Sequence, residues 1–134
     1  MAKDLVRTSE AMYEAWNEGN VDRMIDFWAE DGDWRWEDAP DVPDARVVVG
    51  REAVESHLRE LTSLLGEVQL TAEDLVELDG AVVASIRVRI KGAQSGVELE
   101  DSGAHVVDFE NGRVRRFRTF RSREEAIAAL KRSG

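Results

Sequence analysis

His105, Arg118 and Asp101 are the side chains whose types and spacing could support chemistry. A histidine beside an arginine can act as a general base that the neighbouring cation holds neutral, or can donate a hydrogen bond to a developing oxyanion. Asp101 precedes His105 by four residues on one expected strand, about 13 Å along it, so the two side chains could flank a ligand without touching. The structural alternative is that Asp101, Arg116 and Arg118 lie in solvent at the sheet ends and that His105 is a core histidine.

Two expected hairpins bring these residues to one face of a sheet. A two-residue turn at Asn111-Gly112 pairs His105 with Arg118, and the preceding hairpin pairs His105 with Ala84. The other face then collects the ion pairs, namely Lys91 with Glu98, Arg89 with Glu100, Glu110 with Arg113 and Asp108 with Arg115. The inner face is expected to carry Val82, Ala84, Ile86, Val88, Ile90, Leu99, Val107, Phe109, Val114 and Phe120, together with the polar residues Asp101, His105, Arg116 and Arg118. Because a buried ionisable group without a partner costs several kcal/mol, these four imply mutual pairing or a ligand cavity.

The tryptophans supply a second indication of a cavity. All four precede residue 37, and Trp34 and Trp36 share one face of an expected strand. Together with Trp16 they could wall an apolar pocket for a hydrophobic or aromatic ligand. Packing of the core explains the same residues without any ligand.

Periodicity places helices first and strands later. We expect a helix over residues 3–17, a second from Asn20 to about Asp31-Gly32, a strand over 33–37, and a loop within 30–44. A further amphipathic helix follows Gly50, strands run from Val68 onward, and a last helix begins at Ser122 or Arg123. The pattern predicts a single α+β domain over residues 1–134, with helices packed on one face of a curved antiparallel sheet.

Composition narrows the classes of function. The chain has 134 residues, 18 Lys+Arg, 28 Asp+Glu, a net charge of −10 and no cysteine. The absence of cysteine excludes disulfide frameworks, thiolate nucleophiles and iron–sulfur clusters. The net charge argues against nucleic acid and anionic membranes as partners, although residues 113–134 carry +6 and the other 112 residues −16. No apolar run is long enough for a signal peptide or a membrane span, so we expect a cytoplasmic protein.

Cofactor and metal motifs are not found in the sequence. There is no glycine-rich phosphate loop and no nucleophile elbow around a serine, so nucleotide cofactors and covalent catalysis have no support. His57 and Glu60 lie three residues apart on an expected helix, but two histidines in the whole chain make a weak case for a metal. We therefore expect neither a cofactor nor a metal ion.

Several short stretches, in a characteristic order, resemble a known family. They are WNEGNVD at 16–22, FWAEDGDW at 27–34, GREAV at 50–54, FENGRV at 109–114 and EAIAAL at 125–130. The chain resembles a SnoaL-like member of the nuclear transport factor 2-like superfamily over nearly its whole length. The resemblance implies a cone-shaped α+β fold with a deep pocket between the concave sheet face and the helices, and a homodimer formed through the sheet. The superfamily includes ketosteroid isomerases, polyketide cyclases, epoxide hydrolases, dehydratases and non-catalytic binding modules.

The resemblance also implies roles for individual positions. The acid that stabilises the enolate oxygen in isomerase-like members corresponds here to His105. The basic aspartate of those members corresponds to Trp36, and Asp38 takes this position only if the comparison is shifted by two residues. Their helix tyrosine corresponds to Met12, and Tyr13 is adjacent in the sequence but turned about 100° around the helix. Where many SnoaL-like members have a carboxylate at the end of the last strand, this chain has Arg121-Ser122. These departures argue against ketosteroid-type isomerisation and standard cyclase chemistry.

The resulting expectation is a pocket protein for a small hydrophobic or aromatic molecule. If it is an enzyme, we expect a cofactor-independent lyase, isomerase or hydrolase. The catalytic candidates are His105, Asp101 and Asp38, and the ligand-binding candidates are Arg118, Trp16, Trp34, Trp36 and Met12. The alternative is a ligand-binding or dimerisation module of the same fold without chemistry.

Overall fold

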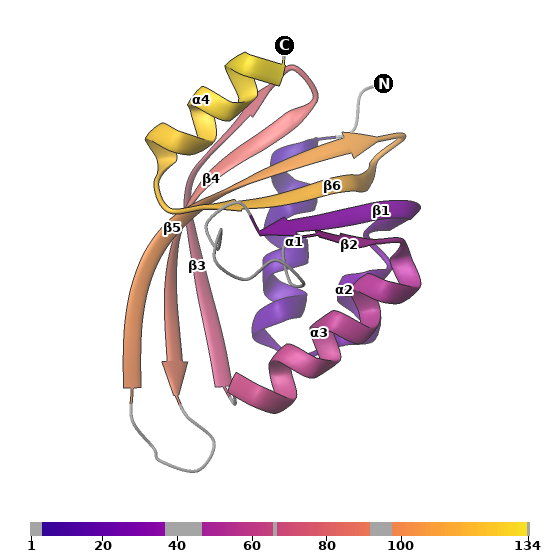
Figure 1. Cartoon of the computed structure of the whole chain (residues 1–134), viewed down its shortest axis with the longest axis vertical. Coiled ribbons are helices and arrows are strands. Elements are labelled where there is room, and N and C mark those ends of the chain that lie inside the picture. Colours follow the sequence, from indigo (N-terminus) through magenta and orange to yellow (C-terminus); the bar gives the residue numbers. More distant parts are fainter. Residues whose placement is uncertain (1–3, 37–46, 66, 92–97, 134) are drawn as a thin grey trace.

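The structure is a computed structural model that describes residues 4–36, 47–65, 67–91 and 98–133. Three helices and two strands come first, followed by four strands and a last helix (Figure 1). The helices are α1 (Leu5–Asn17), α2 (Val21–Ile25), α3 (Arg51–Leu65) and α4 (Arg123–Ser133). The strands are β1 (Trp28–Trp36), β2 (Val47–Val49), β3 (Glu67–Leu78), β4 (Ala81–Lys91), β5 (Glu98–Glu110) and β6 (Arg113–Phe120). Within the described ranges, no helix is long and apolar enough to cross a membrane.

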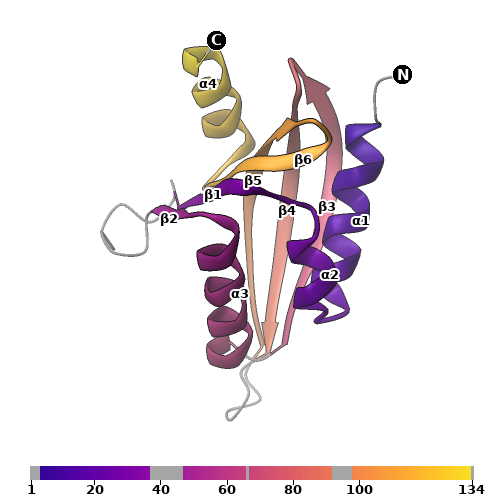
Figure 2. The same ribbon diagram turned by 90° about the vertical axis from the view of Figure 1, so that its right-hand side faces the viewer.

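All six described strands form one sheet, in the order β2-β1-β6-β5-β4-β3. The pair β1 and β6 is parallel and the other neighbours are antiparallel. The sheet is curved and does not close, and α1, α2 and α3 lie on its inner side, as the two views together show (Figures 1 and 2). The expected α+β architecture, with a curved sheet and helices on its inner side, is confirmed, but α4 packs on the outer face and β1 pairs with β6 in parallel, which was not expected.

Helix α1 is fixed at both ends by side chains. The Asp4 carboxylate accepts a hydrogen bond from the Arg7 backbone N–H at 3.2 Å and caps the first turn. At the other end, the Asn17 amide pairs with both backbone groups of Leu70 at 2.8 Å. Leu70 lies on β3, an edge strand whose outward backbone groups need partners. Asn17 therefore docks α1 against the sheet edge and sets the position of the residues that α1 carries.

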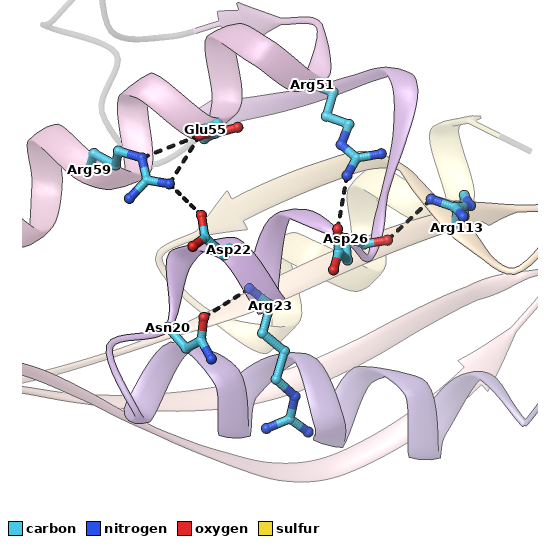
Figure 3. Close-up of polar contacts among 8 residues, drawn as sticks. All are labelled: Asn20, Asp22, Arg23, Asp26, Arg51, Glu55, Arg59 and Arg113. Carbon is cyan, nitrogen blue, oxygen red and sulfur yellow. Dashed lines mark hydrogen bonds and ion pairs between the residues drawn. The ribbon is translucent and has the colours of Figure 1, made fainter.

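Surface ion pairs tie the short helix α2 to its neighbours (Figure 3). Arg59 of α3 contacts Asp22 at 2.6 Å, and Arg51 contacts Asp26 at 3.0 Å. Arg113 of β6 donates to the backbone oxygen of Asp26 at 3.2 Å. Because these groups are largely exposed, each pair contributes about 0–1 kcal/mol, and their main effect is to orient α2 between α3 and β6.

Two separate hydrophobic clusters pack on the two faces of the sheet. The inner cluster is built from α1, α2, α3 and inward side chains of the strands, with the fully buried Trp28 and Phe117 among them. The outer cluster joins α4 to outward side chains of β4, β5 and β6. Its members are Ala81, Val83, Ala104, Val106, Phe120, Ala126 and Ala129. Helix α4 begins as expected, with the Ser122 hydroxyl accepting from the Glu125 N–H at 3.1 Å.

The register of β4 against β5 is as predicted. Arg89 pairs with Glu100 and Ala84 with His105, and the same pairing continues over the length of both strands. The Arg89 and Glu100 side chains form an ion pair of 3.0 Å on the outer face. Opposite charges on one face and apolar side chains on the other both favour this register, since a slip by one residue would mix them.

The predicted register of β5 against β6 is wrong beyond its first two pairs. Phe109 does pair with Val114, but Asp108 then pairs with Arg116, so that Arg115 is an extra residue in β6. A bulge of this kind reverses the side-chain alternation that follows it. His105 therefore lies opposite Thr119 rather than Arg118. Arg116, Arg118 and Phe120 face outward, whereas Phe117 and Thr119 face inward.

The predicted second helix is too long. It ends at Ile25, and β1 begins at Trp28, five residues before the expected strand. Trp28 continues the helical spacing of apolar residues, but β1 runs parallel to β6, and pairing with a distant strand is not visible in local periodicity. The turn-like Gly32 is required inside this strand, because a Cβ atom there would lie 2.6 Å from both Trp28 Cδ1 and the Val114 carbonyl oxygen. The short strand β2 was not expected.

Candidate functional site

A cavity of about 230 Å³ lies between the inner face of the sheet and helices α1 and α3. Its aliphatic lining comes from Leu61, Val68, Leu70, Ile86, Val88 and Ile90. Five of the candidates from the sequence also line it, namely Trp16, Trp34, Trp36, Asp101 and His105. A larger hollow of about 650 Å³ is lined by charged side chains such as Arg89 and Glu100, which already pair with each other. The smaller, mainly apolar cavity is therefore the better candidate for a ligand site.

The His105 ring lines the cavity, and the Tyr13 hydroxyl contacts it. Tyr13 Oη and His105 Nδ1 are 2.8 Å apart, and both side chains are buried. No other hydrogen bond of the Tyr13 hydroxyl is found within the described residues. Because an unpaired buried O–H is costly, we assign the proton of this bond to the hydroxyl, so that Tyr13 donates to Nδ1. His105 then carries its own proton on Nε2.

Burial keeps both partners of this hydrogen bond uncharged at neutral pH. Desolvation lowers the pKa of His105 to about 3, since a charged imidazolium is disfavoured in an apolar environment. Desolvation likewise raises the pKa of Tyr13 far above its ordinary value. Nε2 of His105 has no hydrogen-bond partner among the residues that the structure describes. The ring therefore offers the cavity a neutral N–H donor.

Stacked and tilted aromatic rings make up one wall of the cavity. Trp34 is at the centre, with its ring centroid 5.4 Å from that of Trp36, 6.3 Å from Trp16 and 4.4 Å from Phe117. Trp28 stacks behind Trp34 at 6.0 Å with nearly parallel planes. The Trp34 indole N–H is buried and has no hydrogen-bond partner among the described residues. Three of the five rings, those of Trp16, Trp34 and Trp36, line the cavity itself.

His57 positions one of these indoles. The Trp36 indole N–H donates to His57 Nε2 at 2.9 Å, which places the ring proton of neutral His57 on Nδ1. Desolvation lowers the pKa of His57, and the Glu60 carboxylate acts in the opposite direction. Across the described ranges, no three His, Cys, Asp or Glu side chains come together as a metal site. The structure therefore gives His57 a supporting role for Trp36.

The remaining candidates from the sequence lie in different places. Asp101 is exposed at the rim of the cavity, where its carboxylate accepts from the Ser102 N–H at 2.8 Å. Met12 is completely buried in the inner core and is not among the cavity-lining residues. Asp38 falls outside the described residues.

The expected placement of Arg118 beside His105 is incorrect. The bulge in β6 turns Arg118 to the outer face, where its guanidinium lies 3.2 Å from the Asp108 carboxylate and over the ring of Phe120. Arg116 likewise points outward and lies 3.4 Å from Asp33. Of the described residues that line the cavity, none is a lysine or an arginine.

Tyr13 is the site residue that sequence reasoning did not select. The resemblance pointed to the position of Met12, and Tyr13 is the next residue along the helix. The resemblance therefore indicated the correct part of the helix. Which of the two residues faces the sheet, however, depends on how α1 is rotated. That rotation is set by packing against β3, and the partner of Tyr13 lies 92 residues away in the sequence.

Comparisons with known proteins agree with the fold. The chain is similar to a nuclear transport factor 2-like protein of unknown function from Burkholderia pseudomallei, with a TM-score of 0.78, 21% identity, and coverage of 95% of this chain and 97% of that one. It is also similar to a provisionally named SnoaL-like polyketide cyclase from Jannaschia, with a TM-score of 0.73, 15% identity, and coverage of 94% and 88%. A provisionally named polyketide cyclase from Xanthomonas campestris pv. campestris has a TM-score of 0.69, 23% identity, and coverage of 92% and 94%.

A comparison with curated protein sequences found no significant match. The profile of the SnoaL-like domain matches residues 9–117, which include most of α1, the whole aromatic wall, His105 and most of β6. The chain therefore belongs to the SnoaL-like domain family.

Proposed function

We propose that the cavity binds a small, mainly apolar or aromatic molecule and that His105 is its polar anchor. The observation that carries this proposal is the hydrogen bond between Tyr13 and His105 Nδ1 at 2.8 Å. It occupies one ring nitrogen and leaves the Nε2–H for an acceptor oxygen on the ligand. A hydrogen bond from this N–H to a ligand oxygen would contribute about 0.5–1.5 kcal/mol to binding.

The size of the cavity limits the ligand. Pockets for drug-sized ligands commonly occupy about 300–1,000 Å³, whereas this cavity has about 230 Å³. The expected ligand is therefore small. The aliphatic side chains and the three indoles around the cavity favour burial of its apolar part.

Relatives of similar fold are compatible with this class of ligand. Two similar structures are provisionally named polyketide cyclases, and TerC, another structural neighbour at 14% identity, was crystallised with polyporic acid. These descriptions concern those proteins, and they support a small-molecule pocket in this fold.

A second candidate is cofactor-independent catalysis of a lyase, isomerase or hydrolase type. The neutral Nε2–H of His105 is suited to polarise a carbonyl group or to stabilise a developing oxyanion. It is poorly suited to act as a base, because protonating a group with a pKa of about 3 at pH 7 costs on the order of 5 kcal/mol. A base would have to be a carboxylate, such as Asp101 at the rim or Asp38.

A thermal-shift screen of small aromatic and aliphatic oxygen compounds tests the proposal on the wild type and His105→Ala. We expect ligands that raise the Tm of the wild type to lose most of that increase in His105→Ala. Ser122→Ala is the matched control, because loss of this helix cap lowers stability by about 1 kcal/mol without touching the cavity wall. Equal shifts in wild type and His105→Ala would overturn the anchoring role, and wild-type turnover in His105→Ala would overturn the catalytic one.

A dimerisation function is the remaining candidate, and an apolar strip on the outer face favours it. Val47 and Val49 of β2 are 44% and 65% exposed, while Val48 between them packs on the inner core. We propose that a homodimer through the sheet would cover this strip. Analytical ultracentrifugation of the wild type and Val49→Lys tests this, with dimer expected for the first and monomer for the second. A monomeric wild type at all concentrations would contradict it.

A further inference from the structure

We propose that the ligand of this cavity is a small organic cation, an alkylammonium or quaternary ammonium group attached to a chain with an acceptor oxygen. The indoles of Trp16, Trp34 and Trp36 would hold the cation, and the carboxylate of Asp101 at the rim would neutralise it. This inference rests on the proposed function, since it names the class of ligand for the same cavity.

The charge of the lining is the first argument. Among the described residues that line the cavity, Asp101 is the one with a charged side chain. Arg116 and Arg118, which would have favoured an anionic ligand, point to the opposite face and contact Asp33 and Asp108. The whole chain carries a net charge of −10, so the long-range field also attracts cations to the molecule.

The aromatic wall is the second argument. Indole is the side chain that binds cations best through its ring face, and three indoles line one small cavity. Their neighbouring centroids are 5.4 and 6.3 Å apart, so the three rings form one continuous aromatic wall. The same indoles also bury apolar groups, but they add an attraction for a charged group that aliphatic side chains do not provide.

The positions of the polar groups define the rest of the ligand. His105 lines the cavity, and its N–H donor requires an acceptor oxygen on the ligand. Asp101 lies four residues along β5 from His105, about 13 Å at strand spacing. A molecule with an oxygen at one end and an ammonium group at the other can reach the donor and the indoles together, with its charge directed toward the rim.

The test compares choline with 3,3-dimethylbutan-1-ol, which has nearly the same shape but a carbon atom in place of the charged nitrogen. Binding is measured by calorimetry and by tryptophan fluorescence at constant ionic strength. We expect choline to bind the wild type about tenfold more tightly than the neutral alcohol, because a desolvated cation on indole rings contributes on the order of that factor.

Three variants locate the cation. Asp101→Asn is expected to weaken choline binding about three- to tenfold and to leave the alcohol unchanged. Glu100→Gln is the matched control, since it removes the same unit charge from the neighbouring position on the outer face, and both ligands should bind it as they bind the wild type. Trp16→Leu, at a half-buried position, keeps an apolar side chain but removes one ring, and should weaken choline binding more than alcohol binding.

Each outcome is decisive for one of the two proposals. Alcohol binding that equals or exceeds choline binding overturns the cationic ligand and still supports a small-molecule cavity. Absence of choline binding also overturns the cationic ligand, and the screen on His105→Ala then decides the proposed function separately. Choline binding that is unchanged in both Asp101→Asn and Trp16→Leu places the cation elsewhere and overturns the inference.

Discussion

The two faces of the sheet are built from different chemistry although they share the same strands. The inner face carries indole, phenyl and aliphatic groups around a neutral histidine. The outer face carries ion pairs such as Arg89–Glu100 and Arg118–Asp108, with α4 packed beside them. The charged side chains behind the net charge of −10 therefore lie mostly outside the cavity, and they act on the site through their long-range field. Stability is expected to depend mainly on the inner face, and the following experiments test that difference.

The largest effect is expected when an inner aromatic ring is removed. Phe117 is 1% exposed, and its ring lies 4.4 Å from Trp34 and 4.5 Å from His105. Phe117→Ala should lower the free energy of unfolding by about 3–5 kcal/mol and change the near-ultraviolet circular dichroism of the tryptophans. Val106→Ala, in the outer cluster, should leave that spectrum unchanged. A loss below about 1 kcal/mol for Phe117→Ala would contradict the importance of the aromatic wall.

The next effect is a dependence of stability on pH. His105 titrates near 6.5 in the unfolded chain and near 3 in the folded one. Below pH 6.5 the unfolded chain therefore binds a proton that the folded chain does not, so stability is fully present above that pH and falls on acidification. Urea denaturation measures the free energy of unfolding at each pH. Between pH 7.5 and 4.5, this free energy should fall by roughly 2.5 kcal/mol more in the wild type than in His105→Asn. Equal losses in the two proteins would show that His105 is not buried as a neutral ring.

A smaller effect is expected from the hydroxyl that orients His105. Tyr13→Phe leaves Nδ1 without its donor and should cost about 1–3 kcal/mol in unfolding free energy. Nitrogen NMR of the imidazole should show the proton on Nε2 in the wild type and a mixture of tautomers in the variant. Ser9→Ala is a control on the same helix, because the Ser9 hydroxyl bonds only locally to the Leu5 carbonyl at 2.9 Å. A wild-type ring protonated on Nδ1 would reverse our assignment.

The smallest effect is expected on the outer face. Arg89 and Glu100 are more than half exposed, so Arg89→Ala should change stability by less than about 1 kcal/mol. Arg118→Ala should cost more, because the side chain of Arg118 is 10% exposed and its removal leaves the part-buried Asp108 carboxylate without that partner. Chemical denaturation of both variants at low and high salt measures the difference. Equal costs would mean that burial does not distinguish the two pairs.

The sequence was most informative where neighbouring elements constrain each other. The β4–β5 register is correct because Arg89 and Glu100 on one face and Ala84 and His105 on the other exclude a slip. The rings of Trp34 and Trp36 lie side by side on the cavity wall, as their alternation with polar residues on one strand indicates. In both cases the spacing of polar and apolar residues along a strand determines on which face of the sheet each side chain lies.

The sequence was least informative where one residue or a distant partner decides the outcome. The bulge at Arg115 moved Arg118 away from His105, and nothing in the pattern of charges required it. The parallel pairing of β1 with β6 changed the end of α2, because a strand far along the chain supplies its hydrogen bonds. The bond between Tyr13 and His105 depends on the rotation of a helix against the sheet, which no local rule fixes.

The extra residue in β6 also determines where the length of the chain can change. Arg115 is exposed and unpaired in the register between Val114 and Arg116. A chain without Arg115 would keep all the residue pairs between β5 and β6. A deletion between Arg116 and Thr119 would instead exchange the two faces for the side chains that follow it, and the Phe120 side chain would turn from the outer cluster toward the cavity. Insertions and deletions are therefore expected to be tolerated at position 115 during evolution and to be selected against in the four residues that follow.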